Sequence, residues 1–247
     1  MNTLGLPLTP PGGAMRMTAD PRGESRIEPI GTLYYFGDPM CSWCWGFKPV
    51  LEQLDREYPE LRRVTVMGGL RGGDPAPMSD ELATMIQNAW QRIEEATGQP
   101  FNHEFWRRHR PLATTLPACR AVLTAREMDP ARQWPFMVSM FEAYFTRAED
   151  PSRRETHLAV AKTLGFDPEL FGAMLDSPRI DEALKSDLLT TQRYGVTGFP
   201  TVVLSMGKDN YLVSPGYQPI ESLRRAINAV YKAAGVDFQR PENGLYS

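Results

Sequence analysis

The sequence predicts an α/β fold that carries a large all-helical insertion. Three observations predict it: a strand, a helix and a second strand follow one another early in the chain, the middle has helical periodicity throughout, and strand patterns return only near the C-terminus. At 247 residues, 42% hydrophobic and 23% charged, the chain is long and apolar enough for one large domain with an insertion. We therefore expect one α/β domain interrupted by helices.

The first α/β unit comes early in the chain. Its first strand is the β-branched and aromatic stretch 31–36, which stops at a Gly-Asp-Pro turn. A helix follows directly, because apolar residues from Cys41 to about Tyr58 recur at mostly helical spacing, and Pro49 is expected to kink it. The second strand is 63–67, which ends at a glycine pair. These segments predict a βαβ unit.

The middle of the chain predicts helices only. Proline breaks separate five segments that favour helix. The predicted helices cover residues 80–98, 114–128, 131–148, 154–165 and 180–194. We assign this block, residues 78–194, to a helical insertion domain.

Strand signals return after the insertion. Residues 201–204 and 211–213 are rich in apolar and β-branched side chains, and a Gly-Lys-Asp-Asn hairpin turn separates them. An amphipathic helix at 220–234 closes the fold. The α/β part of the chain would then consist of residues 30–77 and 195–235.

The two ends of the chain carry no pattern of a packed element. The first 29 residues lack the positive and apolar regions of a secretory signal, and no membrane anchor is recognisable in them. We expect residues 1–29 to be disordered, residues 236–247 to form a tail, and the protein to be cytoplasmic. The formal net charge of -3 gives no electrostatic basis for binding nucleic acid or a membrane surface.

The main chemical signal is a pair of cysteines, Cys41 and Cys44, at the start of the first helix. Cysteines three residues apart in a helical turn bring their sulfurs close enough for a disulfide to form and open locally. At a helix N-terminus the unpaired amides and the positive end of the dipole stabilise a thiolate. We therefore predict that Cys41 attacks, and that Cys44, nearly one turn inside, resolves the mixed disulfide.

A single Cys-x-x-Cys motif can also be half of a zinc site, which usually has four ligands. The remaining candidate ligands are Cys119, His103, His109 and His157, and none of them forms a second compact pair. We therefore predict no metal site. Cys119 shares a helical face with apolar residues, which favours core packing. The alternative is a third redox cysteine that pairs with Cys41.

Two tryptophans, Trp43 and Trp45, flank the second cysteine of the pair. Their large apolar surfaces could form a rim on which an unfolded or peptide substrate rests. They could equally pack in the protein core. The spacing of the two residues leaves both alternatives open.

The segment 38–46, Asp-Pro-Met-Cys-Ser-Trp-Cys-Trp-Gly, resembles the active-site segment of the thioredoxin superfamily, as do the strand before it and the proline inside the helix. The Asp-Pro-Met-Cys-x-x-Cys sequence, the helical insertion and residues 195–201, Gly-Val-Thr-Gly-Phe-Pro-Thr, resemble its DsbA family, including FrnE-like predicted disulfide isomerases. The resemblance spans about residues 30–235. It implies a thioredoxin-like fold with a large all-helical insertion.

The resemblance also implies roles for Phe199 and Pro200. In that family the matching proline is cis and lies beside the dithiol, and the residue before it helps to hold the substrate backbone. Proline suits this position because its cis bond costs little and because it has no amide hydrogen to compete near a nucleophilic sulfur. If Pro200 only began a strand, the bond before it would be trans.

The activity that the resemblance implies is that of a protein-disulfide oxidoreductase or isomerase. Its substrate would be a disulfide-containing protein or peptide, or a small thiol. Ser42 and Trp43 stand where some strongly oxidising DsbA-type sites have a histidine, so reduction or isomerisation is the expected direction. No bound cofactor is expected, and glutathione could serve as the redox partner.

Two other classes of function remain open. 2-Hydroxychromene-2-carboxylate isomerases and kappa-class glutathione transferases are similar in having a thioredoxin-like domain with a helical insertion, and they use glutathione with a serine commonly at the reactive position. The presence of both Cys41 and Cys44 counts against such a glutathione-dependent enzyme. The last class is a non-catalytic binding protein or chaperone that kept the fold and lost turnover.

Overall fold

The computed structural model describes residues 17–19, 25–27, 29–73 and 75–236, and its main feature is a mixed sheet. The strands of this sheet are β3 (Gly31–Gly37), β4 (Leu61–Met67), β5 (Thr201–Met206) and β6 (Asp209–Pro215), in the order β4-β3-β5-β6. β3 pairs parallel with β4 and antiparallel with β5, and β5 pairs antiparallel with β6. This arrangement confirms the predicted α/β class and brings the C-terminal hairpin beside the first predicted strand.

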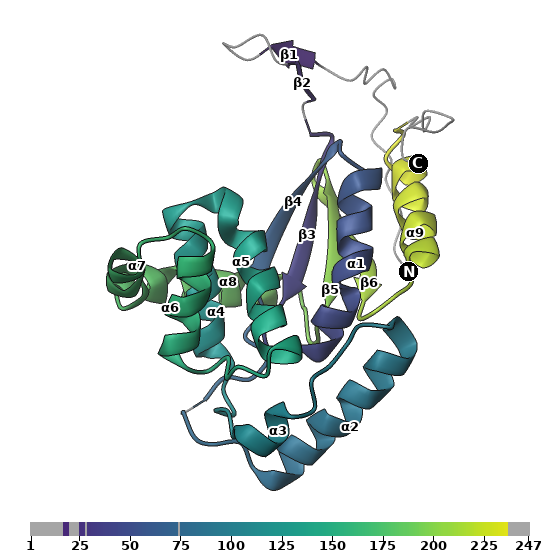
Figure 1. Cartoon of the computed structure of the whole chain (residues 1–247). Coiled ribbons are helices and arrows are strands. Elements are labelled where there is room, and N and C mark those ends of the chain that lie inside the picture. Colours follow the sequence, from purple (N-terminus) through teal and green to yellow (C-terminus); the bar gives the residue numbers. More distant parts are fainter. Residues whose placement is uncertain (1–16, 20–24, 28, 74, 237–247) are drawn as a thin grey trace.

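Two helices lie side by side on one face of the sheet (Figure 1). α1 (Ser42–Glu57) leaves the end of β3 and continues through Pro49, and α9 (Ile220–Ala233) packs beside it and against β6. Alternate residues of a strand point to the same face, so every second side chain of β3 and β5 meets these helices. The buried side chains of this layer include Leu33, Tyr35, Phe47, Leu51, Val202, Leu204, Leu223 and Ile227.

The helical insertion comes between β4 and β5 in the sequence. Its helices are α2 (Asp80–Thr97), α3 (Phe105–Arg108), α4 (Leu116–Met128), α5 (Gln133–Phe141), α6 (Arg154–Thr163), α7 (Pro168–Leu175) and α8 (Pro178–Arg193). Figure 1 shows α4 to α8 gathered on the side of β4, and α2 and α3 near the end of the sheet at which α1 begins. The insertion therefore reaches the predicted dithiol.

The five predicted helices of the insertion are present, with differences in detail. The predicted helix 131–148 is divided into a 3-10 turn (Pro130–Arg132), α5 and a π-helical turn (Glu142–Thr146). α3 and α7 are not predicted from the sequence. α3 has four residues, which is too short for a helical period to be recognised. α7 is short as well, and it begins behind Asp167, whose side chain accepts hydrogen bonds from two amides of its first turn.

Two short strands lie within residues 1–29, the segment expected to be disordered. β1 (Met17–Ala19) pairs antiparallel with β2 (Ser25–Ile27). The β-branched residues Thr18 and Ile27 favour extended backbone. The other residues before residue 29, and the expected tail beyond Val236, lie outside the described residues.

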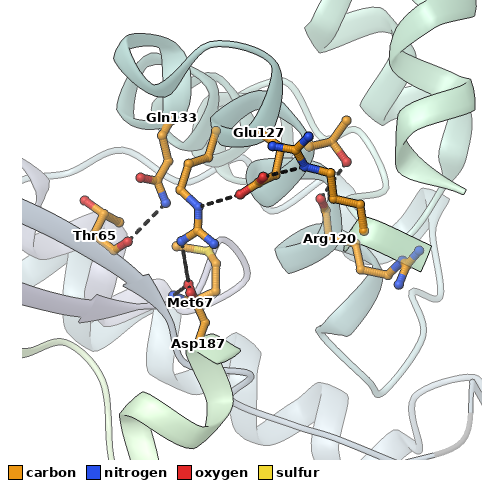
Figure 2. Close-up of polar contacts among 9 residues, drawn as sticks. Thr65, Met67, Arg120, Glu127, Gln133 and Asp187 are labelled. Atoms are coloured by element: carbon orange, nitrogen blue, oxygen red, sulfur yellow. Dashed lines mark hydrogen bonds and ion pairs between the residues drawn. The ribbon is translucent and has the colours of Figure 1, made fainter. Parts of the chain in front are cut away.

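The exposed edge of β4 is closed by side chains of the insertion (Figure 2). The Met67 amide donates to Asp187 Oδ2 of α8 at 2.7 Å, and Gln133 Nε2 of α5 donates to the Thr65 carbonyl at 3.1 Å. Arg126 of α4 donates to both carboxylate oxygens of Asp187, at 2.9 and 3.0 Å. An uncovered strand edge invites pairing with other chains. These contacts satisfy that edge and fix the insertion against the sheet.

The edge contacts predict a large loss of stability in Asp187→Ala. This change leaves the Met67 amide and the partly buried Arg126 without their carboxylate, which should lower the free energy of unfolding by about 3 kcal/mol. Asp181→Ala is the matched control on α8, because the Asp181 side chain is 64% exposed in its ion pair with Arg120. Its loss should stay below about 1 kcal/mol. Equal losses in a urea titration of the two variants would contradict this role for Asp187.

Candidate active site

Cys41 is the N-cap residue of α1, one short turn beyond the end of β3. The amides of Cys44 and Trp45 donate to the Cys41 carbonyl at 3.0 and 3.1 Å, and the Cys44 amide also points to Cys41 Sγ at 3.3 Å. An N-cap side chain normally supplies an acceptor for such unpaired amides. Here the acceptor is the sulfur of Cys41. The partial positive charge at a helix N-terminus favours an anionic nucleophile in this position.

Cys44 lies deeper than Cys41. Cys44 has no exposed surface, whereas Cys41 is 5% exposed. Burial raises the pKa of the Cys44 thiol well above its ordinary value, and the hydrogen bond and charge of Cys41 raise it further. Both sulfurs are free thiols in this structure. The two cysteines therefore lie at different depths, with Cys44 in the core and Cys41 at the cap of α1.

The loop before β5 brings Phe199 and Pro200 to the dithiol. The Phe199–Pro200 peptide bond is cis, Pro200 is buried, and the Cys41 thiol lies 3.5 Å from the Phe199 carbonyl oxygen. A Cβ atom at Gly68, just beyond β4, would overlap the Phe199 ring. Glycine at position 68 therefore leaves the space in which that ring packs, and so helps to place the loop.

A groove of about 480 Å³ opens beside this loop. Its walls come from the loop after α8, from β5 and from the edge strand β6. The lining residues are Tyr194, Gly195, Val196, Thr197, Gly198, Phe199, Thr201, Val203, Asn210, Leu212, Pro215 and Gly216. Leu212 is 62% exposed there, which is unusual for a large apolar side chain on a strand. Phe199 lines this groove and also contacts Cys41, and the volume of the groove is large enough for part of a short peptide.

Asp38 connects the dithiol turn to the insertion. Its carboxylate has no exposed surface and accepts hydrogen bonds from the Met40 amide and the Leu70 amide, both at 2.8 Å. The Thr115 hydroxyl donates at 2.6 Å and the Cys119 thiol at 3.3 Å. The sequence alone identifies this aspartate only as a turn residue, because all but one of its donors are distant in the chain. Its position between the strand and the cysteine pair is the one sequence feature that indicates a role in the site.

The other predicted site residues have different positions. Trp43 is half-buried, and its ring packs against Tyr217 at 5.5 Å between centroids, next to the dithiol. Trp45 is 5% exposed, its Nε1 donates to the Pro100 carbonyl, and it packs against Phe141 and Phe145 of the insertion. The burial of Trp45 favours the core-packing alternative, because the insertion covers that side of α1. Cys119 faces Asp38, and no disulfide links it to Cys41.

Two further properties concern ligands and membranes. Within the described ranges, no group of three or more histidine, cysteine, aspartate or glutamate side chains is arranged to hold a metal ion. None of the helices described is both long and apolar enough to cross a membrane.

Comparison with known proteins finds a match to the family model of the DSBA-like thioredoxin domain over residues 32–228. Among solved structures, the chain is similar to a candidate protein disulfide isomerase from Nitrosomonas europaea, with 31% identity and a TM-score of 0.74 over 82% of this chain and 98% of that one. The cytosolic disulfide reductase DsbM from Pseudomonas aeruginosa, also solved with GSH, has 23% identity and a TM-score of 0.67 over 81% of this chain and 99% of that one. That identity supports the fold alone.

A curated relative, the ClpXP adapter protein SpxH of Halalkalibacterium halodurans, is 27% identical over 193 residues. The match covers 75% of this chain and 61% of the relative. The chain therefore spans less than two thirds of the length of this relative, and the same holds for the SpxH of Bacillus subtilis.

The hydrogen bonds of Asp38 predict that its charge supports the fold of the site. Asp38→Asn replaces an acceptor-only group by an amide that donates toward Leu70 and Thr115, so the free energy of unfolding should fall by about 2 kcal/mol. Asp167→Asn is the matched control, because asparagine caps the exposed start of α7 as well as aspartate does. A stable Asp38→Asn variant in urea titrations followed by tryptophan fluorescence would contradict this assignment.

Proposed function

This chain belongs to the DSBA-like thioredoxin domain family, and from that premise we propose that it is a thiol-disulfide oxidoreductase that reduces or isomerises substrate disulfides. The observation that carries the proposal is the position of Cys41. Its sulfur caps α1 and accepts a hydrogen bond from the Cys44 amide. The Cys41 thiol also lies next to the Phe199 carbonyl oxygen, beside the cis bond of Pro200. A nucleophilic sulfur, a resolving thiol and a place for substrate backbone then meet at one point.

The first step is attack by the Cys41 thiolate on one sulfur of a substrate disulfide. A bond forms between Cys41 Sγ and that sulfur, and the substrate S–S bond breaks. The other substrate sulfur leaves with the electron pair and takes up a proton. The result is a mixed disulfide between Cys41 and the substrate, held beside Phe199.

The second step depends on Cys44. Its thiol loses a proton, its sulfur attacks Cys41 Sγ, and the bond between Cys41 and the substrate breaks. The substrate leaves with two thiols, reduced by two electrons, and the enzyme holds a Cys41–Cys44 disulfide. Because burial raises the pKa of Cys44, this step is slow unless the site helps the thiol to ionise. A slow second step gives the bound substrate thiol time to attack another disulfide of the substrate, which is isomerisation.

We assign substrate binding to the groove beside the cis-proline loop. A disulfide-containing protein or peptide would lie there in extended form, with backbone polar groups of Phe199 next to it and Leu212 as an apolar contact. Trp43, between the two cysteines in sequence and half-buried against Tyr217, adds aromatic surface. A small thiol would occupy only the part of the groove nearest to Cys41.

We assign the reducing direction and a cytoplasmic role. Neither Ser42 nor Trp43 carries a charge that would stabilise the reduced dithiol, and a stabilised reduced form is what makes a strong oxidant. Glutathione is the redox partner we propose: two molecules reduce the Cys41–Cys44 disulfide and are oxidised to glutathione disulfide. The solved complex of the similar DsbM fold with GSH supports this choice.

Cysteine variants test the proposal through the reduction of a model peptide disulfide by glutathione. Cys41→Ser removes the nucleophile, so turnover should fall at least about 100-fold. Cys44→Ser should accumulate a mixed disulfide at Cys41, visible by mass after acid quenching and alkylation. Cys119→Ser is the control, since Cys119 faces Asp38 and should leave turnover within about twofold. Full activity of Cys41→Ser would contradict the proposal.

A glutathione-dependent isomerase or transferase is the second candidate function, and the same variants separate it from the first. Such an enzyme would bind glutathione at the Phe199–Pro200 loop and would not cycle a disulfide. Full activity of Cys44→Ser together with a strict requirement for glutathione would favour this candidate.

An adapter role is the third candidate, because curated relatives are described as ClpXP adapter proteins. In that case client binding would depend on surface contacts rather than on thiol chemistry. Client binding by a Cys41→Ser/Cys44→Ser double variant at the wild-type level, with no reductase activity in the wild type, would favour the adapter.

A further inference from the structure

Tyr35, in the middle of β3, has a buried hydroxyl without a hydrogen-bond partner among the described residues. Its ring is stacked with Phe47 of α1 at 6.3 Å and meets Trp134 of α5 edge-on at 5.8 Å. A phenylalanine would fill the same space. A buried polar group without a partner costs about 1–3 kcal/mol, so the hydroxyl calls for an explanation beyond packing.

The hydroxyl lies toward the dithiol. A Cβ atom at Gly37 would stand 2.6 Å from the Tyr35 oxygen, so glycine at position 37 is what lets the phenol extend along the strand toward α1. Cys44 is the ionisable group that acts most strongly on Tyr35, and its charge raises the pKa of Tyr35 after burial has done so. In return the Tyr35 hydroxyl acts to lower the pKa of Cys44. In this reduced site the two groups interact without completing a hydrogen bond of normal geometry.

Other charges around this pair do not take over its role. Cys41 faces both groups and raises the pKa of each. The Asp38 backbone interacts with the Cys44 sulfur, while the Asp38 carboxylate is held by its own donors. Arg63 acts on Tyr35 from β4, but its guanidinium is paired with Asp55 at 2.6 Å and lies over the Trp134 ring. Tyr35 therefore supplies the side-chain hydroxyl that acts on Cys44.

We propose that Tyr35 is a positioning residue for the resolving step, donating its hydroxyl hydrogen to the Cys44 sulfur when that sulfur becomes a thiolate. The inference rests on the proposed dithiol function. Cys44 gives its proton to the substrate thiolate released in the first step, and its sulfur then attacks Cys41 Sγ as the bond to the substrate breaks. Tyr35 keeps its own proton throughout, because burial holds its pKa well above the ordinary value.

The test is the lifetime of a glutathione mixed disulfide at Cys41 in the full chain, measured from pH 6 to 9 by rapid acid quenching and mass. In Tyr35→Phe the resolution should slow about tenfold at pH 7, and the pH profile should move to higher pH, because the thiolate has lost a donor. The rate of Cys41 alkylation by iodoacetamide in the reduced protein should not change. The melting temperature should not fall, because the change removes an unpartnered buried hydroxyl.

The matched control is Tyr144→Phe. Tyr144 is also fully buried with an unpartnered hydroxyl, but it packs against Trp90 and Phe105 in the insertion. Its pH profile should equal that of the wild type. Wild-type resolution rates in Tyr35→Phe would overturn the inference and leave the dithiol function standing. Failure of the wild type to resolve any mixed disulfide would instead overturn the proposed function.

Discussion

The site depends on the buried side chain of Asp38. A buried carboxyl group needs hydrogen-bond donors around it, and the donors of Asp38 come from its own turn, from the loop after β4 and from the first turn of α4. The dithiol turn and the helical insertion must therefore be in place together. This constraint explains how a helix that starts at Cys41 is held against a part of the chain about 75 residues away in sequence.

The chemistry follows from an asymmetry that this framework imposes on two neighbouring cysteines. Cys41 sits at the cap of α1 and faces the Phe199 loop. Cys44 sits in the core, where burial opposes its ionisation, and the Tyr35 hydroxyl lies beside Gly37, at the end of β3 that leads into the dithiol turn. Two glycines make both placements sterically feasible, Gly37 for the phenol and Gly68 for the ring of Phe199.

Local patterns in the sequence predict much of this structure. The βαβ unit, the cysteine pair at a helix start and the Phe199–Pro200 loop are found where strand periodicity, turn residues and motif order indicate them. Properties that depend on distant packing are not predicted. The sequence leaves Trp45 open between a substrate rim and the core, and only the packing of Phe141 and Phe145 of the insertion shows that it is covered. The roles of Asp38 and Tyr35 depend on tertiary contacts, so local patterns do not predict them. The glycine two residues after Tyr35 is the one local feature that indicates room for its hydroxyl.

The measurement that tests the account most directly is the reduction potential of the Cys41–Cys44 pair, equilibrated against glutathione and read by mass after alkylation. The account predicts a single two-electron transition toward the reducing end of the range of known dithiol catalysts, nearer about -270 mV than about -120 mV. A potential close to that of the strong oxidants would contradict the direction. If no disulfide between Cys41 and Cys44 forms at any ratio of glutathione to its disulfide, the dithiol account as a whole is wrong.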